Sequence, residues 1–214
     1  MQRQGKKILF AGTGGQGVIT AAKLLSDFFV HHGHQVVSGQ LHGMAQRGGA
    51  VQSTVMIDCG MSPMMQAGGA DVVLGCEPVE TVRALPFISI HTTVIMNVTP
   101  VVPFVLSQKI VRGASDAKYP TTETLLGSLY KATPLVVSLN ATEIAENLGS
   151  AKSLNVVMLG CLFGSGVLGY TPDDFLRTAM NGAPSKFADT NRAAFLAGVG
   201  VMSNQQQAKE TLCP

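Results

Sequence analysis

The chain has 214 residues, of which 46% are hydrophobic and 13% charged, and its formal net charge is +2. This length and apolar content suit one domain with a full hydrophobic core. No basic run extends beyond Lys6-Lys7, which argues against a nucleic-acid-binding protein. The charged share is about half of the roughly 25% usual in soluble proteins. Either small neutral residues cover the surface or part of it is buried against another subunit, and we favour the second because obligate interfaces are poor in charge.

We expect neither a secretion signal nor a membrane span. The apolar run before the first glycines is too short for a signal peptide. The most apolar later stretch, 154–168, contains an asparagine and three glycines, so it is unsuited to crossing a bilayer. We therefore expect a cytoplasmic protein without membrane contact. The four cysteines are scattered without a C-x-x-C motif, so we predict no metal site in this chain alone.

The first elements predicted are a strand at 7–11, a glycine turn, a helix at 16–32 and a strand at 34–38. The helix follows from apolar residues at helical spacing: Val18, Ala21, Leu24, Leu25 and Phe28. Gly33 then ends it. This order predicts the opening β-turn-α-β unit of a Rossmann-like sheet.

The later pattern predicts further strands and helices in alternation. The expected strands are 51–57, 71–75, 92–98 and 135–139, and the expected helices are 77–85, 121–131, 141–148, 153–168, one from 171 and one from 186. Residues 99–120, with three prolines, are expected to be a loop. Asn140 and Glu143 form a capping pair, and Thr171 before Pro172 is typical of a helix start. We predict a three-layer α/β/α fold with a mostly parallel sheet, as one domain over 1–198 and a polar tail over 199–214.

The glycine turn contains the pattern G-x-G-x-x-G at Gly12, Gly14 and Gly17. In dinucleotide sites these glycines allow a tight turn, close approach of the pyrophosphate and close helix packing. The acid that normally binds the ribose at the end of the second strand is missing, because residues 36–40 read VVSGQ. The turn therefore either holds a different phosphate or serves only to pack the helix on the sheet.

The loop after the second strand reads LHGMAQRGGAVQS and is expected at the carboxyl edge of the sheet, where ligands bind. Glycine backbones can present N–H groups to a ligand, and Arg47 can hold a phosphate or carboxylate with two hydrogen bonds. A structural loop whose Arg47 pairs with an acid is an equally good explanation of these residue types.

The motifs in these two regions resemble those of the γ-type subunits of 2-oxoacid:ferredoxin oxidoreductases. They are FAGTGGQGVITAAKLL at 10–25 and HGMAQRGGAVQSTVMI at 42–57, followed by GCEPVET at 75–81, LNVVMLG at 154–160 and PSKFADTNRAAFLAG at 184–198. The lead-in HGMAQ before Arg47 resembles the indolepyruvate branch. The similarity covers nearly the whole chain, and it implies the fold of the pyruvate:ferredoxin oxidoreductase γ-domain.

The resemblance implies oxidative decarboxylation of an aryl pyruvate to an acyl-coenzyme A, with reduction of ferredoxin. It implies thiamine diphosphate and iron–sulfur clusters in a large partner subunit, with coenzyme A in the complex and no cofactor held by this chain alone. Ferredoxin would be met through that partner. The chain is then expected to be inactive without the large subunit.

The resemblance assigns two sets of candidate cofactor-binding residues. They are Gly12, Thr13, Gly14, Gly15, Gln16 and Gly17 in the turn, and His42, Gln46, Arg47, Gly48 and Gly49 in the loop. Glu77 matches a family acid, for which helix capping or pairing with an arginine is at least as good an explanation. For Lys186 and Asn191 we favour structural roles. No catalytic residue is assigned.

Three alternatives remain open. The chain could be the equivalent subunit for pyruvate, 2-oxoglutarate or a branched-chain 2-oxoacid. It could be a stand-alone NAD(P)-binding oxidoreductase, or a non-catalytic assembly domain. The cluster His31, His32 and His34 is expected to be a solvated helix end rather than a metal site.

Overall fold

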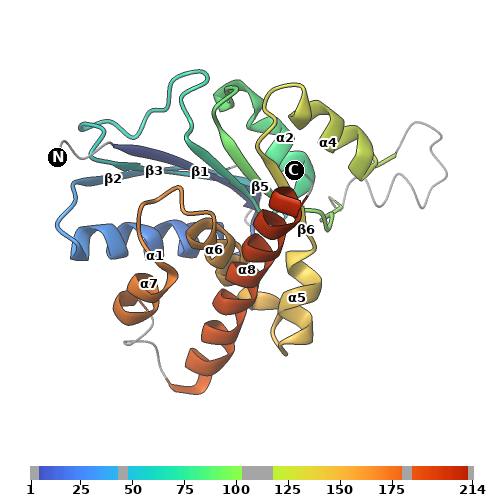
Figure 1. Ribbon diagram of the computed structural model, residues 1–214. Coiled ribbons are helices and arrows are strands. Elements are labelled where there is room, and N and C mark those ends of the chain that lie inside the picture. The colour runs from blue at the N-terminus through green and yellow to red at the C-terminus, as the bar shows by residue number, and fades with distance from the viewer. Residues whose placement is uncertain (1–4, 43–47, 103–117, 180–184, 212–214) are drawn as a thin grey trace.

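The computed structural model describes residues 5–42, 48–102, 118–179 and 185–211. Its centre is a six-stranded sheet with the strand order β2-β3-β1-β4-β5-β6 (Figure 1). The strands are β1 (Lys6–Thr13), β2 (Val36–His42), β3 (Ala50–Ile57), β4 (Val72–Gly75), β5 (Thr93–Asn97) and β6 (Val136–Leu139).

Helices cover both faces of the sheet, which gives the expected α/β/α layers (Figure 1). One face carries α1 (Val18–His31), α5 (Ala141–Asn147), α6 (Leu154–Gly164), α7 (Pro172–Ala179) and α8 (Ser185–Thr211). The other carries α2 (Pro78–Arg83), the 3-10 turn η1 (Leu85–Phe87) and α4 (Thr122–Tyr130). A further 3-10 turn, η2 (Ala151–Ser153), leads into α6. The predicted fold class is confirmed.

The predicted β-turn-α-β unit is present as β1, α1 and β2, but a further strand separates its two strands in the sheet. Strand β3 lies between β1 and β2 and is antiparallel to both, whereas the pairs β1–β4, β4–β5 and β5–β6 are parallel. The connection from β2 to β3 is only residues 43–49, and such a short connection joins antiparallel neighbours, because a parallel crossover needs a dozen or more residues. Strand β2 also continues to His42, over residues expected to be loop, because β3 pairs along its whole length.

The core is centred on α6, whose residues 154–163 are all buried. Helix α6 packs closely on α8, and two glycines allow this approach. A Cβ atom on Gly160 would lie 2.0 Å from the carbonyl oxygen of Phe195, and one on Gly198 would lie 2.0 Å from that of Val157. The absence of charge in this helix therefore reflects burial on every side, as predicted.

Two predicted helix starts are confirmed. Asn140 accepts a hydrogen bond from the Glu143 backbone N–H at 3.1 Å, and the hydroxyl oxygen of Thr171 accepts one from the Asp174 N–H at 3.2 Å. Helix α8 runs to Thr211, over most of the segment expected as a polar tail. The division of the chain at residue 198 stays a prediction. Across the described ranges, every helix is too short or too polar to cross a membrane.

Candidate functional site

The glycine turn follows β1 and is filled by the side chain of Gln16. Its Oε1 accepts hydrogen bonds from the Thr13 backbone N–H at 2.8 Å and the Thr13 hydroxyl at 3.1 Å. Its Nε2 donates to the carbonyl oxygen of Cys76 at 2.9 Å. A Cβ atom on Gly12 would meet Val18, Cys76 and Gln16 at 2.8–2.9 Å. Gly12 is therefore required because the turn, the following helix and β4 converge on it.

Helix α1 begins at Val18, and its N-cap Gly17 has a left-handed backbone with φ of 73° and makes no side-chain cap. Gly15 is also left-handed, with φ of 103°. The first N–H groups of a helix have no intrahelical acceptor, and together with the helix dipole they attract anions. The start of α1 therefore has no side-chain cap over its first N–H groups.

The fold joins the two motifs that the sequence singled out. The Gly14 N–H donates to the Gly49 carbonyl at 2.9 Å, and the Gly48 N–H donates to the Gly14 carbonyl at 3.4 Å. The glycine turn and the end of the β2–β3 loop thus form one backbone unit at the carboxyl end of β1. Gln46 and Arg47 lie outside the described residues, and His42 is placed only as the last residue of β2. Their expected roles stay predictions.

A buried polar network supports this unit from β5. The Nδ2 of Asn97 donates to the Cys76 carbonyl at 3.0 Å, beside the bond from Gln16. The Oδ1 of Asn97 accepts from the Ala141 N–H at 3.0 Å, at the start of α5. Asn97 was not among the residues predicted from the sequence, although an asparagine at the end of a buried apolar strand was a usable signal. Asn97 connects β4, β5 and α5 at the carboxyl edge of the sheet.

Glu77 is a structural residue. It is 1% exposed, and its Oε2 accepts from the Glu80 N–H at 2.9 Å, which caps α2. Its Oε1 accepts from the Val101 N–H at 3.3 Å and from the Tyr119 hydroxyl. Burial, followed by the hydrogen bond to Glu77, raises the pKa of Tyr119, so that the phenol stays protonated and acts as the donor. Of the two roles considered for Glu77, helix capping is the one observed.

A cavity of about 560 Å³ lies beside the turn, between the starts of α1 and α6. Gly15, Gly17 and Asn155 line it, together with Lys152 and Asn191. The Nδ2 of Asn155 donates to the Gly17 carbonyl at 3.2 Å, and the Asn191 Oδ1 accepts from the Ser153 hydroxyl at 3.2 Å. These bonds support the structural role expected for Asn191. The side chain of Lys186 lies outside the described residues.

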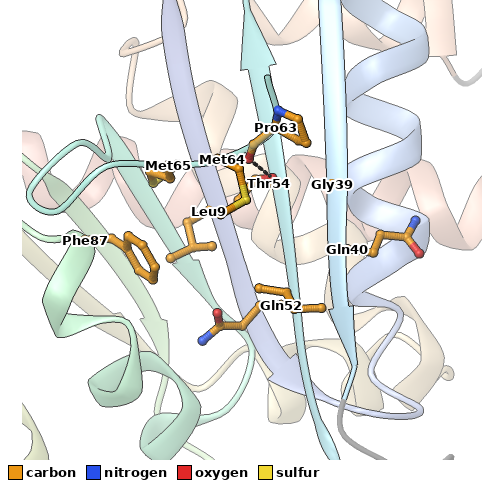
Figure 2. Close-up of a pocket in the computed structure, with 10 residues that line it drawn as sticks. Leu9, Gly39, Gln40, Gln52, Thr54, Pro63, Met64, Met65 and Phe87 are labelled. Carbon is orange, nitrogen blue, oxygen red and sulfur yellow. Dashed lines mark hydrogen bonds between the residues drawn. The ribbon is translucent and has the colours of Figure 1, made fainter. Parts of the chain in front are cut away.

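A second, apolar cavity of about 230 Å³ lies on the opposite face of the sheet (Figure 2). Figure 2 shows Pro63 and Met64 across the strands, with Met65 and Phe87 on the side away from β2. The Thr54 hydroxyl donates to the Pro63 carbonyl at 2.9 Å and holds this loop on the sheet. A Cβ atom on Gly39 would lie 2.7 Å from Pro63, so only glycine fits beneath it.

The described part of the chain contains no cluster of three or more His, Cys, Asp or Glu residues that could hold a metal ion. Burial raises the pKa of the Cys76 and Cys161 thiols to about 12, so both are protonated at neutral pH. Cys76 contributes its carbonyl oxygen to the turn rather than its sulfur.

His34 differs from the expected solvated helix end. Its Nδ1 lies 2.7 Å from the Asp58 Oδ2 and its Nε2 lies 2.7 Å from the Tyr170 hydroxyl oxygen. Its side chain is 10% exposed. His34 thus connects the loop after α1 with the end of β3 and the loop before α7. His31 is exposed, in agreement with the prediction for that residue.

Known proteins resemble this chain in sequence over most of its length. The model of the family described as pyruvate ferredoxin/flavodoxin oxidoreductase matches residues 7–201. The indolepyruvate oxidoreductase subunit IorB of Archaeoglobus fulgidus is 36% identical over 191 residues, which cover 89% of this chain and 92% of that protein.

Two solved structures share the fold. The γ subunit of a keto/oxoacid ferredoxin oxidoreductase from Geobacter sulfurreducens superposes with a TM-score of 0.64 at 21% identity, over 93% of this chain and 99% of that chain. A 2-oxoglutarate:ferredoxin oxidoreductase from Magnetococcus marinus gives a TM-score of 0.64 at 15% identity, over 95% of this chain and 32% of that chain. This chain belongs to the pyruvate ferredoxin/flavodoxin oxidoreductase family.

Proposed function

We propose that this chain is the small subunit of a 2-oxoacid:ferredoxin oxidoreductase that acts on indolepyruvate and related aryl pyruvates. The observation that carries the proposal is the 36% identity to an indolepyruvate oxidoreductase subunit over about nine-tenths of both chains. The family match over residues 7–201 supports the same reaction class.

The chemistry would reside in a large partner subunit that holds thiamine diphosphate and iron–sulfur clusters. The partner's cofactors would decarboxylate the oxoacid and pass electrons to ferredoxin, while coenzyme A accepts the acyl group. The small subunit would contribute a shaped surface beside the reaction centre.

The glycine turn and the β2–β3 loop would bind an anionic part of coenzyme A. The uncapped start of α1 supplies partial positive charge, and the backbone bonds between Gly14, Gly48 and Gly49 hold the adjacent loop on it. Arg47 and Gln46 would complete the site from within that loop.

A dinucleotide fits this turn less well. The Thr13 N–H is occupied by the Gln16 side chain and the Gly14 N–H by the Gly49 carbonyl. Neither donor is then available to a phosphate of a dinucleotide or of coenzyme A, so the ribose contact is what separates these two ligands. The acid expected for ribose binding is also missing from β2, whose sequence is VVSGQLH.

The test is reconstitution with the large subunit that accompanies this chain in cell extracts. We expect indolepyruvate and phenylpyruvate to drive coenzyme A-dependent ferredoxin reduction by the complex, with much lower kcat/KM for pyruvate and 2-oxoglutarate. Each subunit alone is the control and should be inactive. Preference for pyruvate or 2-oxoglutarate would assign the chain to another branch of the family, and full activity of this chain alone would refute the subunit assignment.

A further inference from the structure

The cavity between the starts of α1 and α6 is large enough to hold a small molecule. Its volume is about 560 Å³, and small-molecule pockets usually measure roughly 300–1,000 Å³. The glycine turn borders the cavity at Gly15 and Gly17, and α1 contributes Thr20 and Leu24. The segment 150–156 and α8 complete the lining. We call this space the α1–α6 cavity.

The charge of the lining is positive. Among the described residues that line the α1–α6 cavity, Lys152 is the one charged residue, and no Asp or Glu joins it. Lys152 is exposed and takes part in none of the ion pairs found in the described ranges. The start of α1 meets the same space at Gly17 without a side-chain cap, which adds partial positive charge. The cavity therefore favours an anionic group.

Two asparagines of the lining have unused hydrogen-bonding groups. Asn155 is 5% exposed, and its Nδ2 donates to the Gly17 carbonyl, but its Oδ1 has no donor within the described residues. The Asn191 Oδ1 accepts from the Ser153 hydroxyl, but its Nδ2 has no acceptor in that part of the chain.

The free Oδ1 of Asn155 faces the cavity. The described residues contain one fully buried side-chain oxygen or nitrogen atom without a partner, and it belongs to Glu80. The unpartnered Oδ1 of Asn155 is consequently accessible to solvent, and the α1–α6 cavity is the open space that this otherwise buried residue lines. A ligand that donates to Oδ1 would give a nearly buried acceptor its missing partner.

These groups together define the chemistry of a ligand. Lys152 calls for a negative group, the Asn155 Oδ1 for a hydrogen-bond donor and the Asn191 Nδ2 for an acceptor. Phosphate oxygens accept charge-assisted hydrogen bonds, and sugar hydroxyls both donate and accept. A phosphate ester of a sugar therefore satisfies all three, whereas a free inorganic ion supplies no hydroxyl groups beside its charge.

We propose that the α1–α6 cavity binds a small phosphate ester that carries hydroxyl groups, such as a sugar phosphate or a nucleoside monophosphate. The phosphate lies between Lys152 and the start of α1, and the hydroxyl groups bind Asn155 and Asn191. The site goes beyond the proposed function, because it uses a lysine before α6 rather than Arg47 of the β2–β3 loop and needs no partner subunit.

Calorimetric titration of the full chain with ribose 5-phosphate, adenosine monophosphate and ribose tests the proposal. We expect both phosphates to bind and ribose not to bind at the same concentrations. Tighter binding of adenosine monophosphate would identify a nucleoside phosphate as the ligand, and equal affinities would identify the sugar phosphate alone.

Lys152→Ala should lower the affinity for both phosphates at least about tenfold, because the charge-assisted contact is lost. Lys131→Ala is the matched control, since it removes the same charge from an exposed position at the end of α4 on the other face of the sheet. It should bind like the wild type. Asn191→Asp keeps the acceptor for Ser153 and replaces the free donor by negative charge, so it should also weaken binding.

Three outcomes would overturn the proposal. Wild-type protein that binds neither phosphate, or Lys152→Ala that binds both as tightly as wild type, would refute the site and leave the proposed function intact. Coenzyme A that displaces ribose 5-phosphate from the chain and loses affinity in Lys152→Ala would assign the α1–α6 cavity to the coenzyme A site, and no separate site would remain.

Discussion

Gln16 shows how a residue inside a nucleotide-type motif can acquire a structural role. In the sequence it is one of the variable positions of G-x-G-x-x-G, where no side chain is specified. In the structure its amide occupies the turn and joins Thr13 to Cys76. Gly12 therefore makes room for the neighbouring side chain of Gln16.

Replacing Gln16 by leucine should destabilise the protein. The Thr13 N–H lies in a residue only 4% exposed and would lose its acceptor, and an unsatisfied buried donor costs about 1–3 kcal/mol. Gln16→Glu keeps the acceptor for Thr13 and should lose less, because the Cys76 carbonyl still accepts from Asn97. Urea unfolding of the three proteins measures this order, and equal stability of Gln16→Leu and wild type would contradict the role given to the amide.

Glu80 is a second residue whose environment opposes its charge. One carboxylate oxygen is buried without a hydrogen-bond partner among the described residues, while the other binds Arg83 at 2.7 Å. Burial raises the pKa of Glu80 from its ordinary 4.5, the Arg83 charge lowers it in part, and the Glu77 charge raises it further. The folded state therefore holds this proton more tightly than the unfolded state does.

Glu80→Gln should consequently change how stability depends on pH. A carboxyl group with a raised pKa contributes stability below its unfolded pKa and loses it as pH rises through the folded pKa. The variant should thus gain unfolding free energy relative to wild type at pH 7–8, and the gain should disappear near pH 4. Denaturant unfolding across this range gives the comparison. A difference that is independent of pH would show that the titration of Glu80 is not its source.

At the scale of elements, the crossing of α6 and α8 depends on glycine. Gly160 and Gly198 face the carbonyl oxygens of Phe195 and Val157, so the two helix backbones meet without side chains between them. This close contact places α8 over α6 and buries α6 on all sides. The pattern of apolar residues in α6 predicted burial, whereas the partner helix was not predictable from it.

Gly198→Ala should separate these helices. Its new Cβ atom would overlap the Val157 carbonyl oxygen at 2.0 Å, and strain of this kind costs about 1–3 kcal/mol. Gly200→Ala on the same helix is the matched control, because nothing lies within 4 Å of its Cβ position. Alanine is favoured over glycine in helices by about 0.5–1 kcal/mol, so this control should be slightly stabilised. Thermal melts of both variants should move in opposite directions, and a Gly198→Ala melt at or above that of wild type would exclude the close crossing.

At the scale of the whole molecule, the sheet brings every proposed functional feature to one side. The carboxyl ends of β1 and β2 meet there, since β3 runs antiparallel between them. The glycine turn and the end of the β2–β3 loop consequently form one continuous region. This region is what the small subunit would offer to its partner.

Arg47→Ala should therefore affect the complex rather than the isolated chain. We expect the KM for coenzyme A to rise about tenfold or more, because a bidentate charge-assisted contact would be lost. The KM for the oxoacid and the assembly with the large subunit should stay unchanged. Arg83→Ala, at an exposed arginine on α2, is the control. If Arg47→Ala leaves the KM for coenzyme A unchanged, the loop serves assembly or packing instead.

Much of the fold follows from local pattern. Helical spacing placed α1, the capping residues Asn140 and Thr171 placed two helix starts, and the ordered motifs indicated a family that the comparisons confirm. These signals are local, because caps and periodicity depend on neighbours within a few residues. The sequence by itself thus determined the elements, the fold class and the family.

Only the tertiary structure decided how these elements pair. The insertion of β3 between β1 and β2, the bonds from Gly14 to Gly48 and Gly49, and the bonds of Glu77 with Val101 and Tyr119 all join residues that are distant in the sequence. A strand pattern specifies which face is buried but not which neighbour it pairs with, because parallel and antiparallel partners satisfy the same alternation. The physical reason is that a strand's neighbour depends on how the β2–β3 connection closes and on how α1 packs on the sheet. Both depend on contacts across the whole chain.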